Sequence, residues 1–149
     1  MGVKSIPDGY HSVTPALIVD GAADIISFTE KVFNAEVLTK MEGPDGAVQH
    51  SEVKIGDSLI FIADPMNGSA SAPGWLYVYV DDVDSVYRKA IEAGATSIEE
   101  LSDKFYGDRT GAIKDKAGNH WGIATHVEDV SPEEMEKRVE AYNKQAQES

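Results

Sequence analysis

Residues 75–94 read WLYVYVDDVDSVYRKAIEAG, a strand pattern that passes directly into a helix pattern. Aromatic and aliphatic residues fill the start of this stretch, which is typical of a β-strand. Apolar residues such as Val83 and Val86 then recur at helical spacing, and Gly94 ends the helix. This strand–helix unit decides the fold because the chain contains it twice.

The same order appears earlier in the chain, where the strand pattern SVTPALIVD leads into the helix pattern GAADIISFTEKVF. Each copy continues with three further strand patterns, and the last of them are SLIFIAD and HWGIAT. Equivalent positions keep a nearly constant offset, which is 61 from Val19 to Val80, 60 from Lys54 to Lys114 and 61 from Ala63 to Ala124. Such an offset indicates the duplication of a βαβββ unit.

We therefore predict an α+β fold in which two βαβββ repeats form a cup-shaped curved sheet. One repeat alone cannot bury both its sheet face and its helix, so the two must pack together or across a dimer. Asp20 is the predicted cap of the first helix, and Ser131 that of a C-terminal helix. The predicted boundaries are a single domain over 1–138, repeat one over 11–63, a linker over 64–74, repeat two over 75–127 and a C-terminal helix over 131–146.

The composition narrows the class of partner. The 149 residues carry a net charge of −13 and include no cysteine. The negative charge disfavours nucleic acid and anionic membranes as partners, and the lack of cysteine excludes disulfides and thiolate chemistry. We find no apolar segment of signal-peptide length at the start and none near the roughly 20 residues that span a bilayer. We therefore expect a cytoplasmic protein.

Several segments together resemble a known group of proteins. The two βαβββ copies, the pattern V-D-D-V-D…AGA in the second copy and KD-x-x-GN-x-W near its end resemble the vicinal oxygen chelate superfamily. That group includes glyoxalase I, bleomycin-resistance proteins and extradiol dioxygenases. The segments VTPALIVDGAADIISFTEKVFNAE and HSEVKIGDSLIFIAD look closest to its PhnB-like branch. The resemblance implies a cup that binds a small-molecule ligand, and a homodimer.

The resemblance also implies where enzymatic members would hold a metal ion. Those positions correspond here to Val13, Phe61, Trp75 and Gly122. None of these side chains offers the carboxylate oxygen or imidazole nitrogen that a divalent cation needs. We therefore expect no metal at the family's site and no other cofactor.

The cup is instead expected to present aromatic and polar groups. Alternation along the strand places Trp75, Tyr77 and Tyr79 on one face, which suits flat or amphipathic ligands. Arg109 is expected at the cup mouth, either as a clamp for a carboxylate or phosphate or paired with Asp108 or Asp115. His126 is expected in solvent without a role. The predicted ligand-binding residues are His50, Phe61, Trp75, Tyr77, Tyr79, Phe105, Arg109 and His120.

Three functions remain open from the sequence. The leading hypothesis is a metal-free binding protein that sequesters a drug or metabolite. The alternative is a metal-dependent lyase, isomerase or dioxygenase with a relocated site at His50 and Glu52, joined by His11 or His120; a metal-free version would use His50 or His120 as general base. The third is a structural module whose cup is packed shut. Whether the chain is an enzyme is left open.

Overall fold

The predicted duplication is present in the structure. The computed structural model describes residues 2–148 and has the same element order in both halves. The first half comprises β1 (Ala16–Ile18), α1 (Ala22–Phe33), β2 (Glu36–Glu42), β3 (Val48–Ile55) and β4 (Ser58–Ala63). The second comprises β5 (Trp75–Tyr79), α2 (Val83–Glu92), β6 (Thr96–Asp103), β7 (Asp108–Lys114) and β8 (His120–His126). The predicted α+β class with two βαβββ repeats is confirmed.

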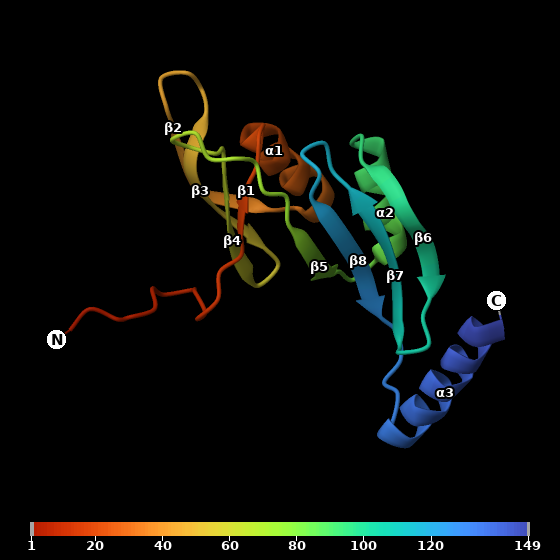
Figure 1. The fold of residues 1–149 in the computed structure, drawn as a ribbon. Helices are drawn as coiled ribbons and strands as arrows, with labels where there is room; N and C mark the ends of the chain where they lie inside the picture. Colours follow the sequence, from red (N-terminus) through yellow and green to blue (C-terminus); the bar gives the residue numbers. More distant parts are fainter. Residues whose placement is uncertain (1, 149) are drawn as a thin grey trace.

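Each repeat forms its own four-stranded mixed sheet (Figure 1). The strand order is β1-β4-β3-β2 in the first sheet and β5-β8-β7-β6 in the second. In both sheets the first strand pairs parallel to the last, and the other pairs are antiparallel. Among the described residues no strand pair joins the two sheets, so β1 and β5 are both edge strands.

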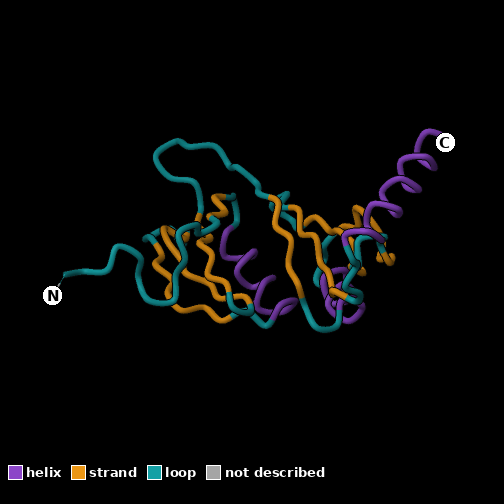
Figure 2. The backbone as a smooth tube through the Cα atoms, turned by 90° about the horizontal axis from the view of Figure 1, so that it is seen from below, coloured by secondary structure: helices purple, strands orange, loops and turns teal. Residues whose placement is uncertain are grey.

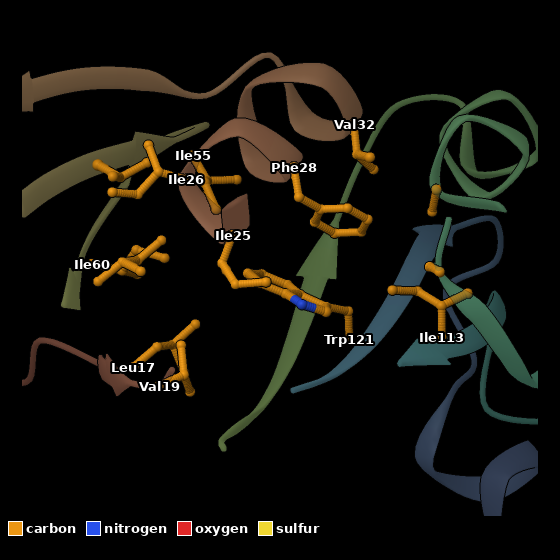
Figure 3. Packing of buried hydrophobic residues seen from close by; sticks show 14 of the residues in the cluster. Leu17, Val19, Ile25, Ile26, Phe28, Val32, Ile55, Ile60, Ile113 and Trp121 are labelled. Carbon is orange, nitrogen blue, oxygen red and sulfur yellow. The ribbon is translucent and has the colours of Figure 1, made fainter. Parts of the chain in front are cut away.

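The two repeats share one hydrophobic core, with α1 lying between the two groups of strands (Figure 1). Trp121 on β8 is fully buried, and its ring centroid lies 6.3 Å from that of Phe28 and 5.2 Å from that of Phe33, both on α1. Figure 3 shows Trp121 beside Ile25 and Phe28 of α1, with Ile113 of β7 on its other side. The second repeat therefore packs against the helix of the first. We call the side of each sheet that is turned away from this core its open face.

The start of α1 is capped differently from the prediction. Gly21, with φ of 78°, occupies the cap position and Asp20 makes no capping contact there. Oδ1 of Asp64 instead accepts hydrogen bonds from the backbone N–H groups of Gly21 and Ala22, at 3.0 and 3.2 Å. Its Oδ2 accepts from the N–H of Val48 at 2.7 Å. One carboxylate thus ties α1 to β3 at the end of β4.

The C-terminal helix α3 (Pro132–Glu148) lies outside the core and extends away from the second sheet (Figure 2). Ser131 accepts a hydrogen bond from the N–H of Glu134 at 3.2 Å, as expected for its cap. Arg138 attaches the helix by donating to the carbonyl of Phe105 at 2.9 Å and to Glu128 at 2.7 and 2.9 Å. In the part of the chain that the structure describes, no helix is both long and apolar enough to cross a bilayer.

Candidate functional site

The open face of the second sheet carries the predicted aromatic residues. Trp75, Tyr77 and Tyr79 alternate along β5 and remain 69%, 45% and 61% exposed. The intervening Leu76 and Val78 turn to the other side and pack against the core. The alternation predicted from the sequence therefore holds. A contiguous patch of solvent-exposed aromatic side chains is typical of an interaction surface.

His120 joins this aromatic row. It pairs with Trp75 across the parallel β5–β8 ladder, and the two ring centroids lie 4.5 Å apart. Nδ1 of His120 is buried and, among the described residues, has no hydrogen-bond partner. A ligand that forms a hydrogen bond with His120 would therefore use the other ring nitrogen, Nε2.

Gly122 leaves no open space on this face, although it has no side chain of its own. It pairs with Tyr77 across β5 and β8, and the Tyr77 ring lies over it. A Cβ added at Gly122 would lie 2.6 Å from Cδ1 of Tyr77, far closer than two carbons can approach. The glycine therefore accommodates the Tyr77 ring.

A carboxylate at the start of β7 organises the two tyrosines. Asp108 is buried, and its Oδ2 accepts hydrogen bonds from the hydroxyls of Tyr77 and Tyr79 at 2.8 and 2.9 Å. Burial raises the pKa of Asp108, but hydrogen bonds from His126, Tyr77 and Tyr79 outweigh it, so the pKa is lowered overall. Burial, together with the bond to Asp108, raises the pKa of Tyr77. The group is thus a carboxylate with neutral phenols.

His126 is exposed to solvent, as predicted, and it also belongs to the same network. Its Nδ1 lies 2.8 Å from Oδ1 of Asp108 and its Nε2 lies 2.7 Å from Oδ1 of Asp129. These two hydrogen bonds raise the pKa of His126. The imidazole therefore links the start of β7 to the connection that leads into α3.

Two predicted ligand-binding residues lie elsewhere. The strand β7 begins at Asp108, before the apolar residues that indicate it in the sequence, so alternation sends the side chain of Arg109 to the helix side of the sheet. There its guanidinium donates two hydrogen bonds of 2.9 Å to Asp84 of α2. Phe105 stacks on Tyr142 of α3, with ring centroids 5.0 Å apart. The prediction that Arg109 lies at the cup mouth is therefore wrong, while a part for Phe105 in ligand binding stays a prediction.

The open face of the first sheet carries the remaining predicted residues. His50 and Phe61 face each other with ring centroids 4.9 Å apart, and Nε2 of His50 lies 3.4 Å from Oε2 of Glu52. Tyr10, from the segment before β1, packs on Phe61 and donates its hydroxyl hydrogen bond to Glu52. Burial and this bond raise the pKa of Tyr10 to about 12. Together with His11 and neighbouring residues they line a pocket of ≈ 380 Å³.

The two groups of residues do not meet within one chain. The pocket beside His50 is lined by residues of the first repeat and the segment before it. A separate pocket of ≈ 260 Å³ at the edge of β5 is lined by Tyr77 and Tyr79 together with the β3–β4 turn. Because the core lies between the two repeats, the two open faces carry separate parts of the predicted ligand-binding set.

The metal-ligating positions implied by the resemblance do not suit a cation. Val13 is 82% exposed and apolar, Phe61 and Trp75 contribute rings, and Gly122 lies under Tyr77. Nor do residues 2–148 contain a group of three or more His, Asp or Glu side chains arranged to hold an ion. The His50–Glu52 pair therefore lacks the third ligand that a relocated metal site would need within one chain.

The sequence reasoning missed the polar groups that orient the aromatic ones. Asp108 and Glu52 each accept a tyrosine hydroxyl, yet neither was placed in the predicted ligand-binding set. Asp108 lies at the same strand parity as Ala112, on the open face. The sequence could have indicated Asp108, because it is a carboxylate at an open-face position of a strand that is otherwise rich in small and apolar residues.

Comparisons with known proteins agree with this architecture. Residues 10–123 match the family model described as the Glyoxalase/Bleomycin resistance protein/Dioxygenase superfamily. An uncharacterized protein of Mycobacterium bovis is 33% identical over 136 residues, covering 84% of this chain and 90% of that protein.

Two solved structures show the same fold. The crystal structure of TioX from Micromonospora sp. ML1 matches with a TM-score of 0.64 and 21% identity, covering 78% of this chain and 100% of that one. Lactoylglutathione lyase from Agrobacterium tumefaciens matches with a TM-score of 0.60 and 22% identity, covering 80% and 94%. Given its two βαβββ repeats and the family match over most of its length, the chain belongs to the glyoxalase/bleomycin resistance protein/dioxygenase superfamily.

Proposed function

We propose that this protein binds an aromatic or amphipathic small molecule without a metal ion, and so sequesters a drug or metabolite. The observation that carries the proposal is the exposed row of Trp75, Tyr77 and Tyr79, with His120 stacked on its first ring. Aromatic side chains with polar tips give a ligand both apolar contact area and hydrogen-bonding groups. His50 and Phe61 supply the matching surface on the first sheet. Phe105 and Arg109 are left out because their side chains are occupied elsewhere.

We further propose that a second copy completes the cup. The half-cup of the first sheet and that of the second lie on different parts of the chain. Both β1 and β5 are edge strands, and the outer edge of β1 carries one bridge, from Ile18 to Ala72. A homodimer that brings β1 of one copy beside β5 of the other would join Phe61 and Trp75 in one cavity and cover the exposed rings. Placement in the PhnB-like branch, a cytoplasmic location and the action of residues 1–138 as one domain stay predictions from the sequence.

Tryptophan fluorescence tests the binding proposal directly. The chain has two tryptophans, Trp75 on the open face and Trp121 in the core. A library of flat aromatic compounds should contain members that change the emission of the wild-type protein and raise its melting temperature. Trp75→Phe should abolish the emission change and leave the Trp121 signal as a control. Binding that alters emission equally in both proteins would place the ligand elsewhere.

A second candidate function rests on the His50–Glu52 pair. A carboxylate 3.4 Å from the imidazole can orient it as a general base, and the pocket beside them opens to solvent. The metal-dependent alternative needs a further ligand, which a second copy would have to supply. Metal analysis after dialysis separates these cases: about one Mn, Fe, Ni or Zn per chain would support the metal enzyme. If metal-free protein has a catalytic activity and the substitution His50→Gln eliminates it, the role of His50 as a general base is supported.

A further inference from the structure

The two tyrosine hydroxyls on the open face have already committed their protons. Tyr77 and Tyr79 both donate to the same oxygen of Asp108, at 2.8 and 2.9 Å. A phenol has a single proton to donate, so what each oxygen still offers is its lone pairs. Towards a ligand, this pair of hydroxyls therefore acts as an acceptor.

Asp108 fixes that polarity. Its second oxygen is taken by Nδ1 of His126 at 2.8 Å, and the side chain is buried. Because its hydrogen-bond partners lower its pKa, Asp108 is an ionised carboxylate at neutral pH and can only accept. Neither tyrosine can then turn its proton outwards without leaving a buried charge short of a partner, which is costly.

The positive charges near the Asp108 end of this surface are paired with carboxylates. The guanidinium of Arg109 lies on the helix side, paired with Asp84 and Asp103. Lys114 has the same strand parity as Asp108 and so lies on the open face, but it pairs with His120 at the opposite end of β7. Both ring nitrogens of His126 are occupied by Asp108 and Asp129.

The hollow beside Tyr79 is lined mainly by hydrogen-bond acceptors. It encloses ≈ 370 Å³ and is lined by Tyr79, Val80, Asp81, Thr125 and His126. Its hydrogen-bonding side chains are thus one acidic residue, two hydroxyl residues and an imidazole that is already bound. An anion entering here would meet lone pairs and a carboxylate, and the positive charge that His126 can carry is already compensated by Asp108 and Asp129.

We propose that the open face of the second sheet selects a planar aromatic cation that donates hydrogen bonds, of the amidinium or ammonium class. The cationic group would receive the lone pairs of the Tyr77 and Tyr79 hydroxyls, while the aromatic part would stack on Trp75. This inference rests on the proposed binding function and reverses the anionic preference that Arg109 suggested from the sequence.

Three naphthalene probes of similar shape test it. 2-Naphthamidinium is a planar cation that donates, 2-naphthoate is a planar anion that accepts, and methyl 2-naphthoate is neutral and donates nothing. Their dissociation constants for the full-length protein are measured by tryptophan fluorescence and by calorimetry. We expect the amidinium to bind at least about tenfold more tightly than the naphthoate, the factor that one hydrogen bond to a charged group gives.

Tyr79→Phe is the matched variant, because it keeps the ring and the net charge of the protein and removes one acceptor oxygen. It should weaken amidinium binding about tenfold and leave the methyl ester unchanged. Asp108→Asn should also reduce the preference for the cation, since the amide can donate to the tyrosines. Tyr79→Phe alone decides the matter if Asp108→Asn does not fold.

The outcomes separate this inference from the proposed function. If naphthoate binds as tightly as the amidinium, or Tyr79→Phe leaves amidinium binding unchanged, the inferred polarity is wrong while an aromatic-binding function stands. If none of the three probes binds, both proposals are overturned. Equal loss of amidinium and methyl ester binding in Tyr79→Phe would show that only the ring matters, which also overturns the polarity.

Discussion

At the scale of single residues, the two tryptophans have opposite surroundings. Trp121 is fully buried, and its indole N–H donates to Oδ2 of Asp115 at 2.8 Å. Trp75 is 69% exposed and touches mainly His120. The same residue type thus serves the core at one position and a surface at the other.

This contrast predicts different costs for the same substitution. Trp121→Ala should lower the free energy of unfolding by about 3–5 kcal/mol, because it leaves a large cavity in the core. Trp75→Ala should change it by less than about 0.5 kcal/mol in the free chain and should remove the ligand response. Urea unfolding followed by circular dichroism measures both. If Trp75→Ala instead unfolds the protein, the Trp75 ring belongs to the hydrophobic core and its assignment to the binding surface is wrong.

At the scale of elements, polar side chains at strand ends fix how the elements meet. Asp64 at the end of β4 holds the start of α1, and Asp108 at the start of β7 holds the tyrosines of β5. His126 at the end of β8 reaches the connection to α3. These contacts fix the relative positions of elements that the pattern of apolar residues in the sequence does not relate to one another.

The cap on α1 gives a prediction with a matched control. Asp64→Ala removes the acceptor of three backbone N–H groups and should cost about 2 kcal/mol in the free energy of unfolding, at the upper end for a helix cap. Asp20→Ala, at the position that the sequence suggested, should cost less than about 0.5 kcal/mol. Chemical denaturation of the two variants checks the difference. Equal costs would contradict the assignment of Asp64 as the cap.

His126 makes stability depend on pH. Its raised pKa means that the folded chain holds the proton more tightly than the unfolded chain, so the stabilisation is full below the unfolded pKa of about 6.5. It is lost as the pH rises through the folded pKa. His126→Gln should therefore destabilise the protein more at about pH 5.5 than at about pH 9. Denaturation at both pH values, with an NMR titration of the imidazole, tests this; a larger loss at high pH would refute it.

The sequence was sufficient for the repeats but not for the polar site. Constant offsets between the copies and the alternation in β5 correctly predicted the element order and the facing of Trp75, Tyr77 and Tyr79. The placement of Arg109 failed because β7 begins earlier than its apolar residues indicate, and one residue of strand reverses a side chain. The partners of Asp108 and His126 come from different strands, so no local pattern reveals them.

At the scale of the whole molecule, the open faces of the two sheets are separate halves of the proposed cup. Phe61 and His50 lie on one, and Trp75 and His120 on the other. A second copy that completes both cups would give two identical sites, each made from both chains. Symmetric pairing of this kind is the commonest arrangement of homo-oligomers.

Mixing two inactive variants tests this arrangement. Phe61→Ala damages the half-cup of the first sheet and Trp75→Ala that of the second, so each homodimer should lose ligand binding. In a mixed dimer one site carries both substitutions and the other carries neither. Mixing after partial unfolding and refolding should therefore restore up to about half of the wild-type signal in the mixed species. No recovery, with mixed dimers verified by mass spectrometry, would place each site within a single chain.

The position of Trp121 has a consequence for how the duplicated chain behaves on heating or in denaturant. Its indole comes from the second half yet is enclosed by Phe28 and Phe33 of the first. Neither half expressed by itself could shield those rings from water, so we expect each to be unstable alone. Although the chain consists of two repeats, the protein should unfold in one cooperative transition.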